Sequence, residues 1–256
     1  MFGPTLADLH GLLTHVTPRL LLLTGLLASG CATSIGGADG SSPAPQTTPE
    51  ADWVSLFDGE TLDGWHGYNR DDVPAGWGVQ NGALHLTPGS GDGGDLIADA
   101  TYDDFELELE WKIAACGNSG VFYRGEEDPA LENVYQTGLE MQVLDDTCHP
   151  DAAYPSHRAG GLYDLYVPTD FGAVRPAGQW NRVRIVADGP RVEHWLNGVK
   201  IVEADAASED WAGRVAASKF RDPADFPAYG TRLGGTIGVQ DHGDEVWYRN
   251  VRIRSL

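Results

Sequence analysis

Three short segments of the chain carry polar side chains in a pattern that could support chemistry. Each alternates apolar and polar residues as a β-strand does, and the segments are 117–124, 138–146 and 237–243. On one face of each strand, the alternation groups Phe122 with Arg124, Glu140 with Gln142, and Gln240 with His242. A carboxylate, a guanidinium, amides and an imidazole are costly to bury without partners. They therefore predict the floor of a polar cleft.

The charge of the chain narrows the classes of partner. The 256 residues have a net charge of −21, and removing residues 1–30 leaves it unchanged because Asp8 and Arg19 cancel. Nucleic-acid binding needs a basic surface, so the composition argues against it. One strand, 105–113, alternates an apolar face with Glu106, Glu108 and Glu110, and we expect these glutamates to form a solvated face.

The first 30 residues have the layout of a secretory signal of the lipoprotein type. Arg19 precedes an apolar run over 20–27, which is too short to span a bilayer, and Ala28-Ser29-Gly30 leads into Cys31. Small residues directly before a cysteine resemble the lipobox of bacterial lipoproteins, although that motif prefers Leu where Ala28 stands. The alternative is an ordinary cleaved signal followed by an incidental cysteine. Lipidation at Cys31 implies an exported protein, anchored to a membrane of the cell envelope.

The remaining chain divides into a tether and one domain. Residues 31–51 are rich in Gly, Ser, Pro and Thr without apolar periodicity, which is typical of a flexible tether. Residues 52–256 have the length of a single domain.

The sequence of the domain predicts β-strands and turns almost throughout. Short runs rich in β-forming residues are separated by turn dipeptides such as Asn81-Gly82 and Asn197-Gly198. Only 209–219 has a helical pattern. About a dozen strands with one short helix predict an all-β sandwich of two antiparallel sheets. The longest segment without strand character, 148–179, contains Tyr163 and Asp164, and we expect it to rim a binding face.

Two cysteines in the domain could pair. If the strands over 117–124 and 138–146 form an antiparallel hairpin with Arg124 opposite Glu140, then Cys116 lies opposite Cys148. An exported protein would retain such a disulfide. The same register leaves a second interpretation open, in which Arg124 and Glu140 form a structural ion pair without a catalytic role.

Several motifs in order resemble one known family. They begin with Leu56-Phe57-Asp58-Gly59 and the Asn118-Ser119-Gly120 strand, and the later ones are 139–145, 161–164, 194–198, 240–243 and 246–253. Over residues 52–256 the chain resembles the 3-keto-disaccharide hydrolase domain family. The resemblance implies a concanavalin-A-like jelly roll whose concave sheet binds a sugar, in an exported bacterial protein.

The chemistry implied by the resemblance is cleavage of a glycosidic bond in a sugar that carries a ketone at C3. The ketone acidifies the C2–H, a base removes this proton, the C1 substituent leaves by β-elimination, and water adds back to the glucal. Glu140 and His242 are the candidates for proton transfer, and Arg124 best matches the charge of the enolate. Residues expected to contact the sugar are Gln142, Gln240, Asn118, Tyr163, Asp164 and Trp195. A divalent metal held by Glu140, His242 and Asp145 could replace the arginine as Lewis acid.

Two functions of other classes remain open at this point. One is a lectin-like module that binds carbohydrate without turnover, because a jelly roll does not determine function. The other is a conventional glycosidase, which needs two carboxylates on either side of the scissile bond, about 5–10 Å apart. A single pocket holding Glu140, Arg124 and His242 would favour the enzyme.

The N-terminal motif makes a direct prediction. Cys31→Ala should move the protein from the membrane fraction to the soluble fraction, because the acylated residue is lost. Fractionation and mass spectrometry of the mature N-terminus test this. A wild-type protein that starts at another residue, with no acyl mass, would contradict it.

Overall fold

The structure is a computed structural model that describes residues 52–90 and 92–256. The predicted signal, the lipidation site at Cys31 and the tether lie outside the described residues. Within those residues, no helix combines the length and apolar character needed to cross a membrane.

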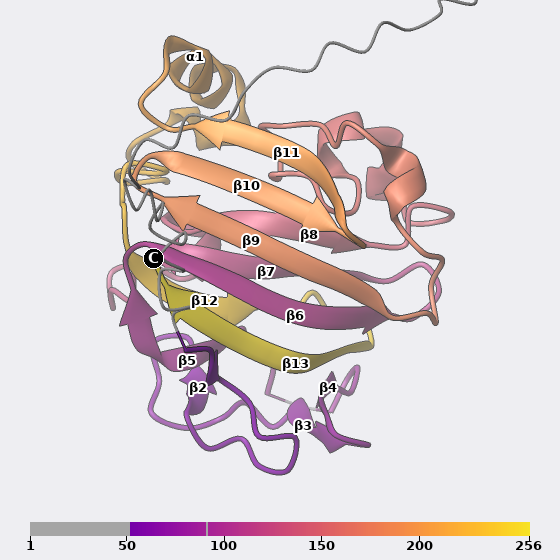
Figure 1. Ribbon diagram of the computed structural model, residues 1–256. Coiled ribbons are helices and arrows are strands. Elements are labelled where there is room, and N and C mark those ends of the chain that lie inside the picture. Colours follow the sequence, from indigo (N-terminus) through magenta and orange to yellow (C-terminus); the bar gives the residue numbers. More distant parts are fainter. Residues whose placement is uncertain (1–51, 91) are drawn as a thin grey trace, which may run out of the picture. The chain divides into compact units, whose positions relative to one another are not determined.

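The described chain forms two antiparallel β-sheets that lie against each other (Figure 1). One sheet has eight strands in the order β11-β10-β9-β6-β13-β4-β3, with β1 paired to β13. The other has five strands in the order β2-β5-β12-β7-β8. The strands are β1 (Val54–Ser55), β2 (Trp65–Gly67), β3 (Trp77–Gln80), β4 (Ala83–Leu86), β5 (Leu96–Tyr102), β6 (Phe105–Ile113), β7 (Asn118–Gly125), β8 (Leu139–Leu144), β9 (Asn181–Asp188), β10 (Arg191–Leu196), β11 (Val199–Asp205), β12 (Gly235–Val239) and β13 (Val246–Ser255).

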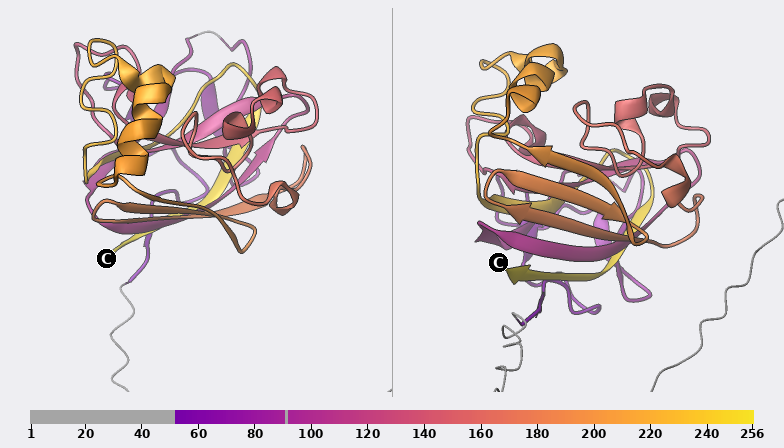
Figure 2. Two further views of the ribbon diagram at one scale, coloured as in Figure 1. Left: turned by 90° about the horizontal axis from the view of Figure 1, so that it is seen from above. Right: turned by 45° about the horizontal axis from the view of Figure 1, so that its top comes forward.

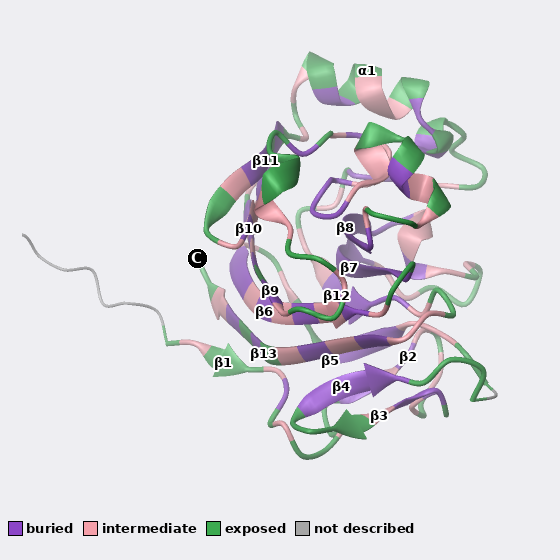
Figure 3. Ribbon diagram, turned by 90° about the vertical axis from the view of Figure 1, so that its right-hand side faces the viewer, coloured by how far each residue is buried: buried purple, intermediate pink, exposed green. Residues whose placement is uncertain are grey.

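Alternation along the strands produces the core between the sheets. In β6, Phe105, Leu107 and Leu109 face inward and are at most 1% exposed, and in β7 and β8 Val121 and Met141 do the same from the other sheet. Figure 3 shows that β7 and β8 are buried along their whole length. Because the inner faces of these strands fill the core, their outer faces must be covered by other parts of the chain.

That cover comes from the irregular segments and the helix. The segment 148–179 contains three 3₁₀ turns, η2 (Pro150–Ala153), η3 (Pro155–His157) and η4 (Phe171–Ala173). α1 (Glu209–Ala217) follows β11 and is continued by the 3₁₀ turn η5 (Lys219–Arg221), while η1 (Val134–Gln136) precedes β8. Figure 2 shows α1 and the 148–179 segment rising from the sandwich at separate places.

The predicted all-β sandwich is confirmed, and most element boundaries agree with the sequence pattern. The hairpin turns have the left-handed backbone that Asn-Gly pairs favour, with φ of 53° at Asn81 and 50° at Asn197. The helix ends two residues earlier than the pattern suggested, at Ala217. Ser208 caps its N-terminus by accepting a hydrogen bond from the Trp211 N–H at 3.1 Å.

The glutamates of β6 are not a simply solvated face, as the sequence had suggested. Glu108 accepts hydrogen bonds from Arg182 at 2.9 Å and pairs with Arg252, and Glu110 accepts one from Arg249 at 2.6 Å. The outer face of the eight-stranded sheet is therefore a lattice of ion pairs between β6, β9 and β13.

The disulfide between Cys116 and Cys148 is confirmed. The strand register used to predict it is wrong by two residues, because β7 and β8 place Phe122, and not Arg124, opposite Glu140. The cysteines still meet because both lie in the connections beyond the strand ends, where hydrogen bonds between the strands do not fix the backbone.

This disulfide closes a loop with a sequence separation of 32 residues. Replacing both cysteines by serine should lower the free energy of unfolding by about 3–4 kcal/mol, because the unfolded chain regains the entropy that the loop removes. Urea unfolding of the oxidised wild type and the double variant measures the difference. An unchanged denaturation midpoint would show that the bridge contributes nothing to stability.

Candidate active site

The outer face of the five-stranded sheet carries a row of polar residues that crosses three strands. Gly120 in β7 pairs with Gln142 in β8, and on its other side the Gly120 carbonyl accepts a hydrogen bond from the Gln240 N–H at 2.9 Å. Gln240 follows β12 directly. The two glutamines thus stand on either side of a glycine, on the face opposite the core.

Glu140 occupies the space that this glycine leaves open. A Cβ atom on Gly120 would lie only 2.4 Å from Oε1 of Glu140. Any larger residue at position 120 would push the carboxylate away. The position of Glu140 over the sheet therefore depends on the absence of a side chain on the neighbouring strand.

These residues line a pocket of about 190 Å³. Its walls are Asn118, Tyr135, Glu140, Gln142, Tyr163, Lys219, Gln240 and His242. Six of the eight were predicted from the sequence. The remaining two, Tyr135 and Lys219, come from segments that showed no functional pattern.

Glu140 is an ionisable group in an unusual setting. The residue is 4% exposed, and its carboxylate makes no hydrogen bond to any described residue. Burial raises the pKa of Glu140 to about 8, and the positive charge of Lys219 opposes this shift. Such a carboxyl can change between acid and base near neutral pH.

Lys219 supplies the cation of the pocket. It begins η5, and its backbone N–H donates a hydrogen bond to Oδ2 of Asp164 at 2.9 Å. The residue as a whole is exposed, but its Nζ reaches inward to 4.3 Å from the centre of the Tyr163 ring and 5.1 Å from that of Tyr135. Removal of this ammonium group from water lowers the pKa of Lys219.

The long segment after Cys148 positions one wall, as the sequence analysis expected. The Tyr163 N–H donates a hydrogen bond to the Glu140 carbonyl at 3.0 Å, so this segment continues the sheet beyond β8. His157 stacks on the Tyr163 ring with the ring centres 4.3 Å apart. Asp164 does not line the pocket. Its carboxylate accepts a hydrogen bond from the backbone N–H of Lys219 and lies 3.2 Å from His157 Nε2, so it positions residues of the pocket wall.

A chain of amides connects the floor to His242 at the rim. Gln142 Nε2 donates to Asn118 Oδ1 at 3.0 Å, and Asn118 Nδ2 lies 3.4 Å from His242 Nε2. The side-chain oxygens of Gln142 and Gln240 are buried and accept no hydrogen bond from the part of the chain that the structure describes. An unpaired buried carbonyl oxygen favours a ligand that brings hydroxyl donors.

Arg124 does not belong to this pocket, which corrects the prediction. Its φ of 58° is left-handed, and this breaks the alternation that would have placed it on the same face as Phe122. The guanidinium is buried and donates to the Gly189 carbonyl at 2.7 Å, with Asp104 at 3.6 Å. The suggested ion pair with Glu140 is therefore also wrong.

Trp195 is likewise elsewhere. It lies in β10 of the eight-stranded sheet, on the outer face, where its indole N–H donates to Glu193 at 2.7 Å and Arg184 packs over the ring. This places it on the sheet that does not carry Glu140. It cannot stack on a sugar bound over the five-stranded sheet.

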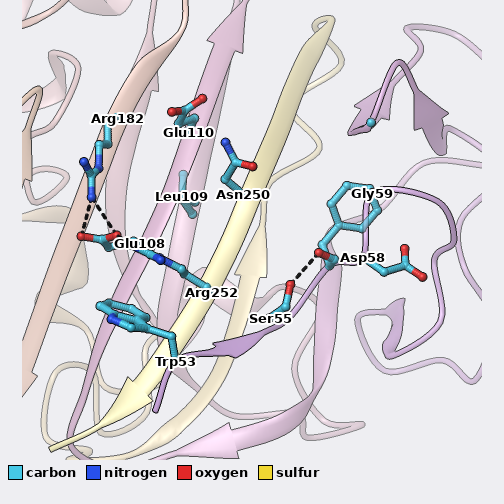
Figure 4. A pocket seen from close by; sticks show the side chains of 12 residues that line it. Trp53, Ser55, Asp58, Gly59, Glu108, Leu109, Glu110, Arg182, Asn250 and Arg252 are labelled. Atoms are coloured by element: carbon cyan, nitrogen blue, oxygen red, sulfur yellow. Dashed lines mark hydrogen bonds and ion pairs between the residues drawn. The ribbon is translucent and has the colours of Figure 1, made fainter. Parts of the chain in front are cut away.

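A larger hollow on the outer face of the eight-stranded sheet is a weaker candidate. Its volume is about 630 Å³, and Figure 4 shows Glu108 between Arg182 and Arg252, next to Trp53. Both oxygens of Glu108 already accept hydrogen bonds from arginines. Because its charged groups satisfy one another, this hollow offers less for chemistry than the smaller pocket.

The residues suggested as metal ligands are not brought together. Among the described residues, one group of three has its ligand atoms within 4.8 Å of one another, namely Cys116, Asp145 and Cys148. The two cysteines form the disulfide and cannot act as thiolate ligands. Asp145 accepts hydrogen bonds from the Cys116 N–H and from Thr147, away from Glu140 and His242.

Comparison with known proteins gives one consistent result. The profile of the 3-keto-alpha-glucoside-1,2-lyase-like domain matches residues 52–254. A 3-keto-disaccharide hydrolase of Bacteroides thetaiotaomicron is 36% identical over 228 residues, covering 80% of this chain and 78% of that protein.

Two crystal structures of candidate glycosyl hydrolases from Parabacteroides distasonis have the same fold. One is 34% identical with a TM-score of 0.72 and covers 80% of this chain and 94% of its own. The other is 27% identical with a TM-score of 0.62, and covers 80% of this chain and 100% of its own. The chain therefore belongs to the family of the 3-keto-alpha-glucoside-1,2-lyase-like domain.

Proposed function

We propose that the protein cleaves glycosidic bonds in 3-keto-glycosides by abstraction of the C2 proton and β-elimination, followed by hydration of the glucal. Membership of the family supports a glycoside-cleaving activity. The observation that carries the mechanism is the buried carboxyl of Glu140, which has no hydrogen-bond partner among the described residues and faces a pocket that also holds Lys219 and His242.

The groups have complementary tasks in elimination. Glu140 as carboxylate removes the C2 proton, and the electrons move into the ketone, whose oxygen becomes enolate-like next to the cation of Lys219. His242 at the rim donates a proton to the departing C1 oxygen. Lys219 thus takes the electrostatic role that the sequence pattern predicts for Arg124.

Hydration can use the same groups in reverse. Water adds to C1 with His242 as proton acceptor, and the protonated Glu140 returns its proton to C2. Each group ends in the protonation state in which it began, so the pocket is ready for another cycle. The open amide oxygens of Gln142 and Gln240 suit the hydroxyl groups of the sugar.

The two other functions are less well supported by this geometry. A conventional glycosidase needs two carboxylates across the bond, but Glu140 is the one carboxylate among the residues that line the pocket. A binding module has no need of a carboxyl whose pKa is raised to about 8, because strongly shifted groups are typical of catalytic sites.

We also propose that the protein is exported and anchored to the cell envelope through Cys31. The support comes from the N-terminal sequence and from the disulfide, since disulfides persist in oxidising compartments outside the cytosol.

The mechanism predicts a strict requirement for the ketone. The purified protein should cleave a 3-keto-disaccharide and leave the unoxidised parent intact, because only the ketone makes the C2 proton acidic. Chromatography of both reactions, with and without EDTA, measures this. Equal cleavage of the parent sugar would contradict the mechanism, and loss of activity in EDTA would reveal a metal.

Replacing the base should abolish most turnover without unfolding the protein. Glu140→Gln should reduce kcat by about two to four orders of magnitude, while Glu60→Gln at an exposed turn should have no effect. In the wild type, kcat/KM for a 3-keto-glycoside whose leaving group needs no protonation should rise tenfold per pH unit until about pH 8, because the base acts only when ionised. Full activity of Glu140→Gln with an intact melting temperature would exclude Glu140 as the base.

A further inference from the structure

The surroundings of the Lys219 amine suit a nucleophile as well as a positive charge. Its Nζ lies 4.3 Å from the centre of the Tyr163 ring and 5.1 Å from the centres of the Tyr135 and Phe220 rings. No described carboxylate lies within ion-pair distance of it. The carboxylates of Glu140, Asp164 and Asp151 act on the amine only through space, and no direct ion pair with a described residue holds it permanently as an ammonium.

The amines of the other lysines in the chain contact side chains outside the pocket. The chain contains three lysines, Lys112, Lys200 and Lys219. Lys200 binds Glu193 at 3.3 Å and also pairs with Glu203, and Lys112 packs 3.8 Å above the Trp247 ring. Both lie on the outer face of the eight-stranded sheet, remote from Glu140. Lys219 is therefore distinguished from both by its place in the pocket that holds Glu140.

The substrate class in the proposed function carries a ketone, which is the natural partner of such an amine. A lysine that is partly withdrawn from water can condense with a ketone to a Schiff base. An iminium withdraws electrons more strongly than a neutral ketone and makes the adjacent C–H more acidic. Aromatic faces stabilise a cation, and this holds for an iminium as well as for an ammonium group.

We propose that Lys219 forms a Schiff base with C3 of the keto sugar, and that Glu140 removes the C2 proton from this iminium. The proposal rests on the proposed function and deepens it from electrostatic to covalent catalysis. Glu140 faces the same pocket as the Lys219 amine, so one ligand can contact both groups.

The steps balance without an oxidant or a further co-reactant. The neutral Nζ attacks C3, and loss of one water with uptake of one proton from solvent gives the iminium. Glu140 takes the C2 proton to form an enamine, whose electrons expel the C1 oxygen as His242 protonates it. One water then adds across C1 and C2 as Glu140 returns its proton and His242 regains one, and a second water hydrolyses the iminium, which releases the keto sugar, the free amine and the proton taken up at the start.

Reductive trapping tests the proposal directly. The full chain is incubated with a 3-keto-disaccharide and sodium cyanoborohydride, and the lysines are mapped by peptide mass spectrometry while product formation is followed in parallel. We expect one sugar adduct as a secondary amine on Lys219, progressive loss of activity, and no adduct on Lys112 or Lys200. The unoxidised disaccharide should give no adduct.

Two results would overturn the proposal in distinguishable ways. Turnover of the keto sugar without any adduct on Lys219 would limit this residue to electrostatics and leave the proposed function intact. Absence of both cleavage and adduct would refute the Schiff base together with the proposed function.

A charge-preserving variant provides an independent test. Lys219→Arg keeps a cation but removes the nucleophilic amine, so activity should fall at least about a hundredfold, the smaller end of what loss of one catalytic group costs. The matched variant Lys112→Arg should retain wild-type activity, and circular dichroism should show both folded. Near-normal turnover of Lys219→Arg would contradict covalent participation.

Discussion

The burial of one carboxyl group on the face of a β-sheet is the constraint on which the site depends. Glu140 is almost fully enclosed and has no hydrogen-bond donor among the described residues, which would be costly for a permanent anion. Burial raises the pKa of Glu140 to about 8, so that near neutral pH the group is mostly uncharged and this cost is avoided. Gly120 provides the room, and Lys219 provides the charge that favours the ionised form when it is needed.

The two sheets have different roles, because one carries ion pairs on its outer face and the other carries the polar residues of the pocket. The eight-stranded sheet ties β6, β9 and β13 together through ion pairs on its outer face, and its inner face fills the core. The five-stranded sheet shares that core, so its outer face is free to carry polar groups. Residues from β7, β8 and the segment after β12 then converge with Tyr163 and Lys219 from two covering segments.

The sequence alone predicts the position of a site residue correctly where strand alternation is unbroken. Glu140, Gln142 and Gln240 were placed correctly because each lies in or directly beside a regular strand. Arg124 was misplaced because a single left-handed residue at the end of β7 reverses the direction of its side chain, and no sequence rule marks that position. Trp195 was misplaced because alternation gives the face of a strand but not the sheet to which the strand belongs.

Lys219 illustrates the other limit of sequence reasoning. The helical pattern over 209–219 ends on this residue, but where the segment packs is decided by contacts with Asp164 and Tyr163, some 55 residues earlier in the chain. The disulfide was found despite an incorrect register, since the loops that carry Cys116 and Cys148 absorb the difference. Local patterns therefore locate polar faces, and tertiary contacts complete the site.

The central claim is that the bond at C1 breaks only after the C2 proton has been removed by Glu140. The most direct measurement is a rapid-quench single turnover of a 3-keto-disaccharide that carries either hydrogen or deuterium at C2. The account predicts that deuterium at C2 slows cleavage several-fold, because the C2–H bond must break for the C1 substituent to leave. Equal cleavage rates of the two substrates, with no glucal intermediate in the quenched samples, would contradict the account and indicate direct displacement at C1.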